Sequence, residues 1–223
     1  TKDAKYADVM EKALYNTVLA GIAMDGKSFF YVNPLEVWPD NCMNRTSMEH
    51  VKPVRQKWFG VACCPPNIAR TLASLGQYIY GEDEDSIYVN LYVSNETETQ
   101  IKGIPCKITM DSDFLSTGNV KISLRSQEDT KGKLALRVPG YVKSFQVYRN
   151  GEEILNPLIE KGYLILEELK EEEMITISCD MKAKFIHANP EVRADEGKVA
   201  IMRGPLVYCL EETDNGRNLS SLY

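Results

Sequence analysis

The sequence predicts a mixed fold, with helices in the first third of the chain and an antiparallel β-sandwich after them. Two segments, 4–20 and 64–79, space their apolar residues three and four apart, which is the period of an amphipathic helix. From residue 87 on, short runs of alternating apolar and polar residues follow one another, separated by Gly, Pro and Asn. Short alternating strands at such spacing are typical of a sandwich.

The first helix is predicted over 4–20. Asp3 is placed to cap its N-terminus, and Gly21 is expected to end it. Its apolar side chains form one stripe, which consists of Tyr6, Val9, Met10, Ala13, Leu14 and Val18. Asp25-Gly26 then predicts a turn, and the aromatic run 27–32 predicts a short strand.

A long polar stretch, 35–57, separates Tyr31 from the next helix. A loop of this length inside a compact domain is usually functional or disordered, so we expect it at the rim of a pocket. Trp38, Trp58 and Phe59 are interpreted as core residues, with their ring faces against a sugar as the alternative.

Cys63 and Cys64 lead into the second helical segment and are followed by Pro65 and Pro66. Proline is tolerated in a first helical turn, so the thiols are expected at a helix N-terminus, where unpaired N–H groups favour a thiolate. The pair is thus the most reactive spot predicted, although two buried inert thiols or a strained vicinal disulfide also fit it. The helix beyond is expected to turn four apolar residues toward a core, namely Ile68, Leu72, Leu75 and Ile79.

The remaining strands are predicted from alternation and from the turn residues between them. They cover 87–93, 98–102, 106–110, 119–125, 133–138, 144–149, 163–167, 173–179, 183–188, 198–203 and 205–211. Asn150-Gly151 is typical of a two-residue hairpin turn. Cys106, Cys179 and Cys209 fall within these strands and are interpreted as buried packing residues.

Composition and charge exclude several classes of partner. The 223 residues include 26 basic and 32 acidic side chains, which gives a net charge of −6. That balance argues against nucleic acid and an anionic membrane surface, and is compatible with a neutral sugar. No segment approaches the roughly 18 apolar residues of a membrane span, and no signal peptide opens the chain. The six cysteines are too irregularly spaced for a disulfide framework, so reduced thiols and a cytoplasmic location are expected.

The string WFGVACCPPNIARTLASLGQYIY at 58–80 resembles the cysteine motif of glycoside hydrolase family 127, the β-L-arabinofuranosidase family. Similar stretches are YADVMEKALYN at 6–16, FFYVNPL at 29–35 and GKVAIMRGPL at 197–206. The resemblance implies the C-terminal portion of such an enzyme. Residues 1–81 would be the end of an (α/α)6 barrel catalytic domain, 82–182 a β-sandwich, and 183–223 the start of a second, incomplete sandwich.

By the same resemblance, Cys63 is the nucleophile of a retaining glycosidase and a zinc ligand, and Cys64 is a second zinc ligand. The family's remaining ligands, from a Glu-x-Cys segment, and its acid/base glutamate are expected upstream, since this chain contains no Glu-x-Cys. Val61 stands where relatives often carry a further cysteine. Tyr31 is expected to hydrogen-bond the sugar or the nucleophile, and Glu11 to hold a sugar hydroxyl. Core packing for Tyr31 and a solvated position for Glu11 are the alternatives.

The sequence therefore predicts a fragment of a zinc-dependent retaining glycosidase that acts on β-L-arabinofuranosides or related sugars and is inactive as the isolated chain. The alternative function is a catalytically inert β-sandwich module for carbohydrate binding or assembly. A zinc site made within the chain by Cys42, His50 and the cysteine pair, and redox chemistry at that pair, are further alternatives. The expected partner is an oligosaccharide or arabinofuranoside, with homodimerisation left open.

Overall fold

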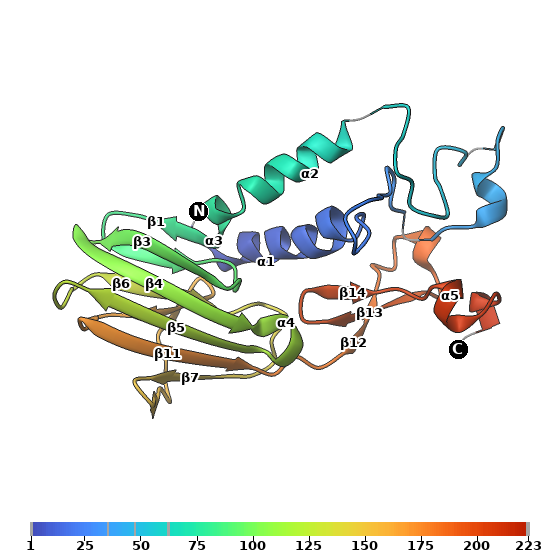
Figure 1. Ribbon diagram of the computed structural model, residues 1–223. Coiled ribbons are helices and arrows are strands. Elements are labelled where there is room, and N and C mark those ends of the chain that lie inside the picture. The colour runs from blue at the N-terminus through green and yellow to red at the C-terminus, as the bar shows by residue number, and fades with distance from the viewer. Residues whose placement is uncertain (1, 35, 47, 62, 222–223) are drawn as a thin grey trace.

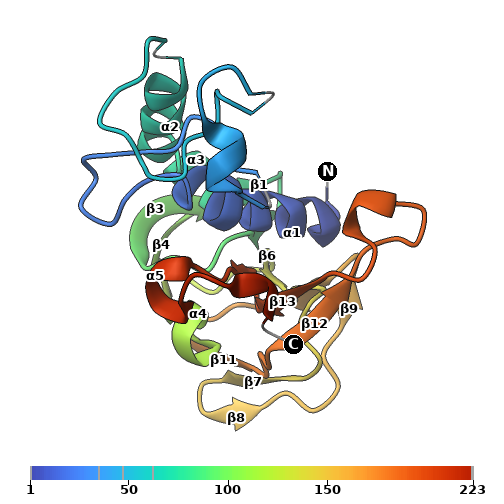
Figure 2. The same ribbon diagram turned by 90° about the vertical axis from the view of Figure 1, so that its right-hand side faces the viewer.

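Most of the regular structure is β-sheet, and the helices within residues 4–19 and 64–79 lie on one side of it (Figures 1 and 2). The computed structural model describes residues 2–34, 36–46, 48–61 and 63–221. Among these residues, no helix is long and apolar enough to cross a membrane.

Two sheets hold the strands that follow the helices. In spatial order, the five-stranded sheet consists of β1 (Tyr80–Glu82), β2 (Ser86–Val89), β6 (Lys133–Arg137), β10 (Tyr163–Leu166) and β9 (Ile159–Glu160). The six-stranded sheet consists of β3 (Asn95–Ile101), β4 (Ile104–Asp113), β5 (Asn119–Ser126), β11 (Glu172–Cys179), β7 (Phe145–Arg149) and β8 (Glu152–Glu153). The pairs are antiparallel, except that β2 runs parallel to β6, which corrects the purely antiparallel prediction.

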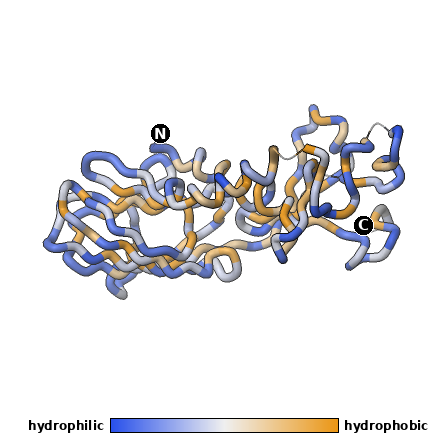
Figure 3. The backbone as a smooth tube through the Cα atoms, turned by 45° about the horizontal axis from the view of Figure 1, so that its top comes forward, coloured by the Kyte–Doolittle hydropathy of each residue, from blue (hydrophilic) through white to orange (hydrophobic). Residues whose placement is uncertain are grey.

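One apolar core contains side chains from both sheets. Leu134 and Leu136 alternate inward from β6, and Ile122 and Leu124 do so from β5. Figure 3 shows hydrophobic stretches along the strands in the part of the molecule near the N-terminus and hydrophilic turns at the outer end of these strands. β5 buries one face and largely exposes the other, as its alternation predicted, whereas β6 is buried on both faces.

A third sheet of three antiparallel strands lies beside the two-sheet unit (Figure 1). It consists of β12 (Lys184–His187), β13 (Val199–Arg203) and β14 (Leu206–Tyr208). Its strands were also expected, although β14 ends before Cys209 and leaves that side chain exposed. The prediction of a buried Cys209 is therefore wrong, whereas Cys106 and Cys179 are buried as predicted.

The first helix differs from its prediction in two ways. Helix α1 spans Ala4–Ala13, is capped by Asp3 as expected, and continues as a π-helical segment, η1 (Leu14–Leu19). Tyr6 and Val9 of the predicted stripe are 55% and 67% exposed. The buried positions are instead Ala4, Ala7, Glu11 and Leu14. A small side chain is needed at position 4, because Ala4 packs against Ala135 and Tyr163 on the outer face of the five-stranded sheet.

The second helical segment is also interrupted. Helix α2 (Cys64–Ala73) ends before a turn, and α3 (Gly76–Ile79) begins a new one. Ile79 is buried as expected, but α2 itself has no buried residue and Leu72 is 40% exposed, so the predicted core-facing stripe holds only at its end.

Three other sequence predictions have mixed outcomes. Asn150 and Gly151 both have positive φ and join β7 to β8, which confirms the hairpin. The predicted strand at 27–32 is wrong, because only Phe29 pairs there, through isolated bridges to Ile22 and Gln56. The loop beyond contains a short 3₁₀ turn, η2 (Pro39–Cys42).

Minor helical turns complete the structure. They are α4 (Phe114–Thr117), η3 (Arg193–Asp195), α5 (Glu212–Asn215) and η4 (Leu219–Ser221).

Candidate active site

Tyr31 and the two adjacent cysteines meet at the N-terminus of α2. The Tyr31 hydroxyl lies 3.1 Å from Sγ of Cys63, which in turn lies 3.9 Å from Sγ of Cys64. Cys63 is exposed and Cys64 half-buried, so a solute can reach the first thiol. The structure thus brings together three of the four side chains that the sequence singled out.

The helix start explains the position of the thiols. Cys63 is the N-cap residue of α2, and Pro65 and Pro66 occupy the first turn, where a missing N–H costs no hydrogen bond. The Asn67 side-chain amide donates to the carbonyl oxygen of Cys63 at 2.8 Å and fixes the backbone there. The positive end of the helix dipole favours negative charge on these sulfurs.

An aromatic cluster places Tyr31 over the helix start. Phe29 exchanges two backbone hydrogen bonds with Gln56, which joins the segment around Tyr31 to the segment that leads to the cysteines. The Phe59 ring then packs between Phe29 and Tyr31, with ring centroids 5.1 and 5.5 Å away. Both Phe59 and Tyr31 are half-buried. Sequence reasoning considered each aromatic residue separately and so missed this contact.

The two thiols have different acidities. The hydrogen bond from Tyr31, and then that with Cys64, lowers the pKa of Cys63. Burial, and then the bond with Cys63, raises the pKa of Cys64. The hydrogen bond with Cys63 also raises the pKa of Tyr31, so the phenol stays protonated and can donate to a thiolate. Cys63 is therefore the better nucleophile of the pair.

The thiol pair fits part of a zinc site. Two thiolates bound at about 2.3 Å to one tetrahedral zinc ion stand about 3.8 Å apart, close to the separation of these sulfurs. Within the described ranges, however, no group of three or more His, Cys, Asp or Glu side chains converges. Cys42 is buried and donates to the Trp38 carbonyl oxygen at 3.2 Å, while His50 is exposed. The structure does not assemble the alternative zinc site with those two residues.

Glu11 does not join this cluster. Its side chain is 1% exposed, and its two oxygens accept hydrogen bonds from Arg137 at 2.6 Å and from the Tyr141 hydroxyl at 2.7 Å. Neither sugar binding nor a solvated position describes these surroundings. The signal that was missed in the sequence is Arg137, a charged residue that directly follows the buried apolar residues 134–136 of β6.

The two tryptophans of the loop region are on the surface. Trp38 is 56% and Trp58 67% exposed, so the interpretation of both as core residues is wrong for this chain.

Comparison with known proteins identifies the family. Residues 1–77 match the model of the β-L-arabinofuranosidase catalytic domain of glycoside hydrolase family 127, residues 86–181 match that family's middle domain, and residues 183–223 match its C-terminal domain. The chain belongs to glycoside hydrolase family 127.

Individual family members cover the chain almost completely. A non-reducing end β-L-arabinofuranosidase from Bifidobacterium longum subsp. longum is 39% identical over 222 residues, 96% of this chain and 33% of that protein. The crystal structure of a family 127 β-L-arabinofuranosidase from Geobacillus stearothermophilus is 48% identical, with a TM-score of 0.92, over 98% of this chain and 35% of that one. A second solved structure, a family 127 β-arabinofuranosidase, is 34% identical with a TM-score of 0.81, over 95% of this chain and 34% of that one. The chain thus spans about a third of the length of these family 127 relatives.

Proposed function

We propose that this chain is the portion of a retaining β-L-arabinofuranosidase that carries the nucleophile, Cys63. The observation that supports this most is the exposed Cys63 thiol, at a helix N-terminus and 3.1 Å from the Tyr31 hydroxyl. The names of the family 127 relatives support the substrate class.

In the proposed first step, Sγ of Cys63 forms a bond to the anomeric carbon while the glycosidic C–O bond breaks. The leaving oxygen takes a proton from an acid outside the cluster described here, expected to be a glutamate of a longer enzyme. In the second step, water attacks the anomeric carbon and gives a proton to the same group outside the cluster, which now acts as a base; the C–S bond breaks and Cys63 leaves as a thiolate. Two displacements at one carbon retain its configuration, as in retaining enzymes that use two carboxylates.

Tyr31 assists both steps from its position over Sγ. As a hydrogen-bond donor it stabilises the thiolate before attack and again when the thiolate leaves. Cys63 and Cys64 are the residues that would hold zinc, which when bound keeps such a thiol deprotonated. Their 3.9 Å separation supports this proposal, and the other ligands would come from further chain.

The domain assignment is part of the same proposal. Residues 1–81 would end an (α/α)6 barrel, 82–182 would form a sandwich from the two sheets, and 183–223 would begin a second sandwich. A cytoplasmic location and a homodimer stay predictions.

Kinetics of the enzyme that contains this chain test the proposed nucleophile. Release of the aryl group from an aryl β-L-arabinofuranoside should fall below detection in Cys63→Ser and drop strongly in Cys64→Ser. The Cys209→Ser variant is the matched control, because this exposed thiol lies outside the site, and it should keep the parent rate. A Cys63→Ser enzyme with the parent rate would refute the assignment.

For the isolated chain, the alternative function is a catalytically inert module. This alternative is favoured because the described residues bring only two thiols together, whereas a zinc ion prefers four ligands. Incubating the isolated chain with the same aryl glycoside and zinc separates the two functions. Zinc-dependent release of the aryl group would rule out the inert module.

A further inference from the structure

The two adjacent thiols lie at the end of α2 that is away from the sheets (Figure 1). None of the residues 64–73 that form this helix is buried, so packing against the rest of the chain gives the helix start little support. The arrangement of Cys63 and Cys64 therefore depends mainly on hydrogen bonds made within the first turn of α2.

The two prolines of this turn prevent the usual cap. A helix start is commonly stabilised when the N-cap side chain accepts a hydrogen bond from the N–H of the second or third helical residue. In α2 these residues are Pro65 and Pro66, which carry no N–H. Their missing N–H groups cost no bond within the helix, but they also cannot bind Sγ of Cys63. The sulfur is thus left free for Tyr31 and a ligand, while the helix start lacks its usual stabilisation.

The Asn67 side chain supplies a replacement for the cap. Its amide donates to the carbonyl oxygen of Cys63 at 2.8 Å. A carbonyl oxygen has two lone pairs, so this bond adds to the first helical hydrogen bond, which an N-cap carbonyl already accepts. The carbonyl belongs to the peptide that joins Cys63 to Cys64. The Asn67 bond therefore fixes the rotation of one thiol residue relative to the other.

Hydroxyl groups make the same type of bond further along α2. Oγ1 of Thr71 donates to the Asn67 carbonyl oxygen, and Oγ of Ser74 donates to the Arg70 carbonyl oxygen, each at 2.9 Å. In both cases the acceptor lies four residues back, as it does for Asn67. Serine and threonine are known to make this bond in helices, so a hydroxyl at position 67 can replace the amide as the donor.

We propose that Asn67 is a positioning residue, which holds the peptide between Cys63 and Cys64 so that both thiolates face one zinc ion or another soft divalent ion. The 3.9 Å between the two sulfurs is close to the separation of about 3.8 Å for two thiolates on one tetrahedral ion. A pair held in place before the ion arrives loses less conformational freedom on binding. The inference rests on the proposed function only in taking this pair as part of a metal site, and goes beyond it in the role of Asn67.

Cadmium binding to the full chain tests this role. Cd²⁺ is a soft ion that favours thiolate ligands, and its bonds to sulfur give an ultraviolet charge-transfer absorption that can be titrated. We expect the reduced chain to bind Cd²⁺, and Cys63→Ser and Cys64→Ser each to remove most of the absorption. Asn67→Ala should weaken the affinity by about threefold to tenfold, which corresponds to one neutral hydrogen bond.

Two further readouts separate positioning of the pair from general support of the helix. Asn67→Ser should restore most of the cadmium affinity, because its hydroxyl can donate to the same carbonyl oxygen. Iodoacetamide should label Cys63 in Asn67→Ala at close to the parent rate, because that reaction needs one thiol and its bond with Tyr31, not the pair. Alanine also favours a helix more than asparagine does, so thermal melting should show little loss of stability.

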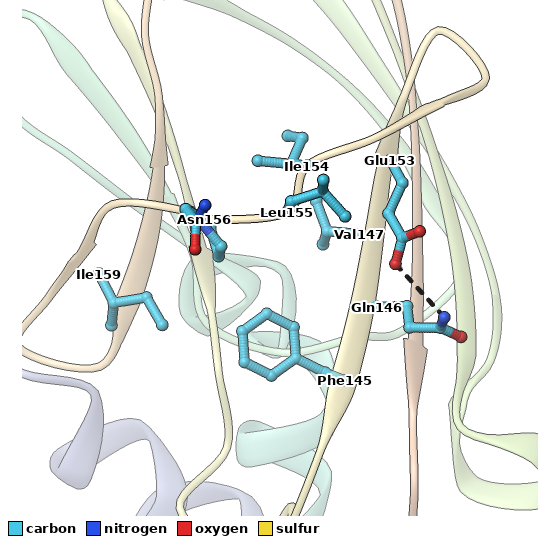
Figure 4. Close-up of a pocket in the computed structure, with 9 residues that line it drawn as sticks. Phe145, Gln146, Val147, Glu153, Ile154, Leu155, Asn156 and Ile159 are labelled. Atoms are coloured by element: carbon cyan, nitrogen blue, oxygen red, sulfur yellow. Dashed lines mark hydrogen bonds between the residues drawn. The ribbon is translucent and has the colours of Figure 1, made fainter.

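Two control variants lose a hydrogen bond elsewhere in the chain. Thr71→Val removes the bond to the Asn67 carbonyl oxygen, one turn further along the same helix. Gln146→Ala removes an exposed amide of β7, which donates to the Glu153 carboxylate at 3.4 Å (Figure 4). Neither bond involves the peptide between the thiols, so both variants should keep the parent's cadmium affinity.

Several results would overturn the inference. Equal cadmium affinity of Asn67→Ala and the parent would do so, as would a loss that Asn67→Ser does not restore. A loss that Thr71→Val shares, or that comes with slower labelling of Cys63, would mean that the helix start is only loosened. A cadmium absorption that is absent, or that survives Cys63→Ser, would show that the pair is not arranged for one ion. By contrast, a Cys63→Ser enzyme with the parent rate would refute the nucleophile and leave the role of Asn67 in place.

Discussion

At the scale of single residues, hydrogen bonds and burial set the six thiols apart. Burial raises the pKa of Cys106, and it raises that of Cys179 to about 12. The hydrogen bond from Tyr31 lowers the pKa of Cys63, which is exposed. Thiolates react and thiols do not, so these differences predict an order of reactivity.

We predict that iodoacetamide modifies Cys63 first in the folded, metal-free chain. Peptide mass spectrometry at short times should find the label there before Cys209, which is also exposed, and none on Cys106 or Cys179. Tyr31→Phe should slow the labelling of Cys63 by roughly threefold to tenfold, because the thiolate loses its hydrogen-bond donor. Faster labelling of Cys209 than of Cys63 would contradict this account.

Contacts between residues that lie far apart in the sequence were the hardest feature to predict. The cysteine motif predicted the Cys63 and Cys64 site because adjacent thiols before two prolines form a local signal. Glu11 gave no such signal, since its partners Arg137 and Tyr141 lie more than a hundred residues away and only the fold brings them together. A glutamate on an amphipathic helix looks the same in sequence whether it faces solvent, substrate or a buried arginine.

At the scale of elements, a single glycine, Gly118, forms the turn between α4 and β5. Gly118 has φ +82°, and an added Cβ would lie 2.2 Å from the Cys179 carbonyl oxygen. Both the backbone conformation and the close approach require glycine.

We predict that Gly118→Ala lowers the free energy of unfolding by about 2 kcal/mol or more. The matched control is Gly76→Ala, because Gly76 has no atom within 4 Å of an added Cβ and no positive φ. That change should be neutral or stabilise by up to about 1 kcal/mol. Urea unfolding measures both variants, and equal midpoints for the two would contradict the steric argument.

A second element, the β7–β8 hairpin, is tied to β11 by a buried carboxylate. Glu173 accepts hydrogen bonds from Arg149 Nε at 3.0 Å, Asn150 Nδ2 at 2.8 Å and the Lys170 N–H at 2.8 Å. Burial alone would raise the pKa of Glu173, but the hydrogen bonds from Arg149 and Lys170 lower it.

This lowered pKa predicts the direction of a pH effect on stability. The folded state prefers the ionised form, so the stabilisation is present above the unfolded pKa of about 4.3 and is lost as the pH falls through the lower folded pKa. Glu173→Gln should be less stable than the parent at neutral pH, and the difference should narrow in acid. The control is Glu172→Gln, at the exposed neighbouring residue, and its difference in stability from the parent should not narrow in acid. Urea unfolding at several pH values measures this, and a difference that widens in acid would contradict it.

Sequence alone predicted the strands better than their pairing. Alternation and turn glycines are local, so β4, β5 and β11 lie close to their expected positions. The parallel pairing of β2 with β6 depends on how the chain crosses between sheets, and neither strand encodes it locally. The π-helical segment that follows α1 was missed for a similar reason, since Asn16 in it forms hydrogen bonds with Pro205 and Val207 of the distant β13–β14 hairpin.

At the scale of the whole molecule, Arg137 joins the helical segment to the sheets. Its guanidinium has no exposed surface and donates to Asp8 and Glu11 of α1 at 2.7 and 2.6 Å. Asp8 also accepts from the Gly140 N–H at 3.0 Å. Helix α1 is thereby fixed on the outer face of the five-stranded sheet (Figure 2).

We predict that Arg137→Met lowers the free energy of unfolding by about 3–5 kcal/mol, because Glu11 is left buried and unpaired. Adding Glu11→Gln should recover part of this loss, since the buried charge is then removed. Arg125→Met, at a side chain that is 72% exposed, is the control and should change stability by less than about 0.5 kcal/mol. Chemical unfolding of the parent, the two single variants and the double variant measures their free energies of unfolding. A double variant less stable than Arg137→Met would contradict the charge argument.

The most direct test of Cys63 as nucleophile is mass spectrometry of the enzyme that contains this chain, quenched in acid during turnover of an aryl β-L-arabinofuranoside. The account predicts one pentosyl unit on the peptide that includes Cys63, absent from Cys63→Ala and absent before substrate is added. A pentosyl unit on another residue, or full turnover by Cys63→Ala without any adduct, would contradict it.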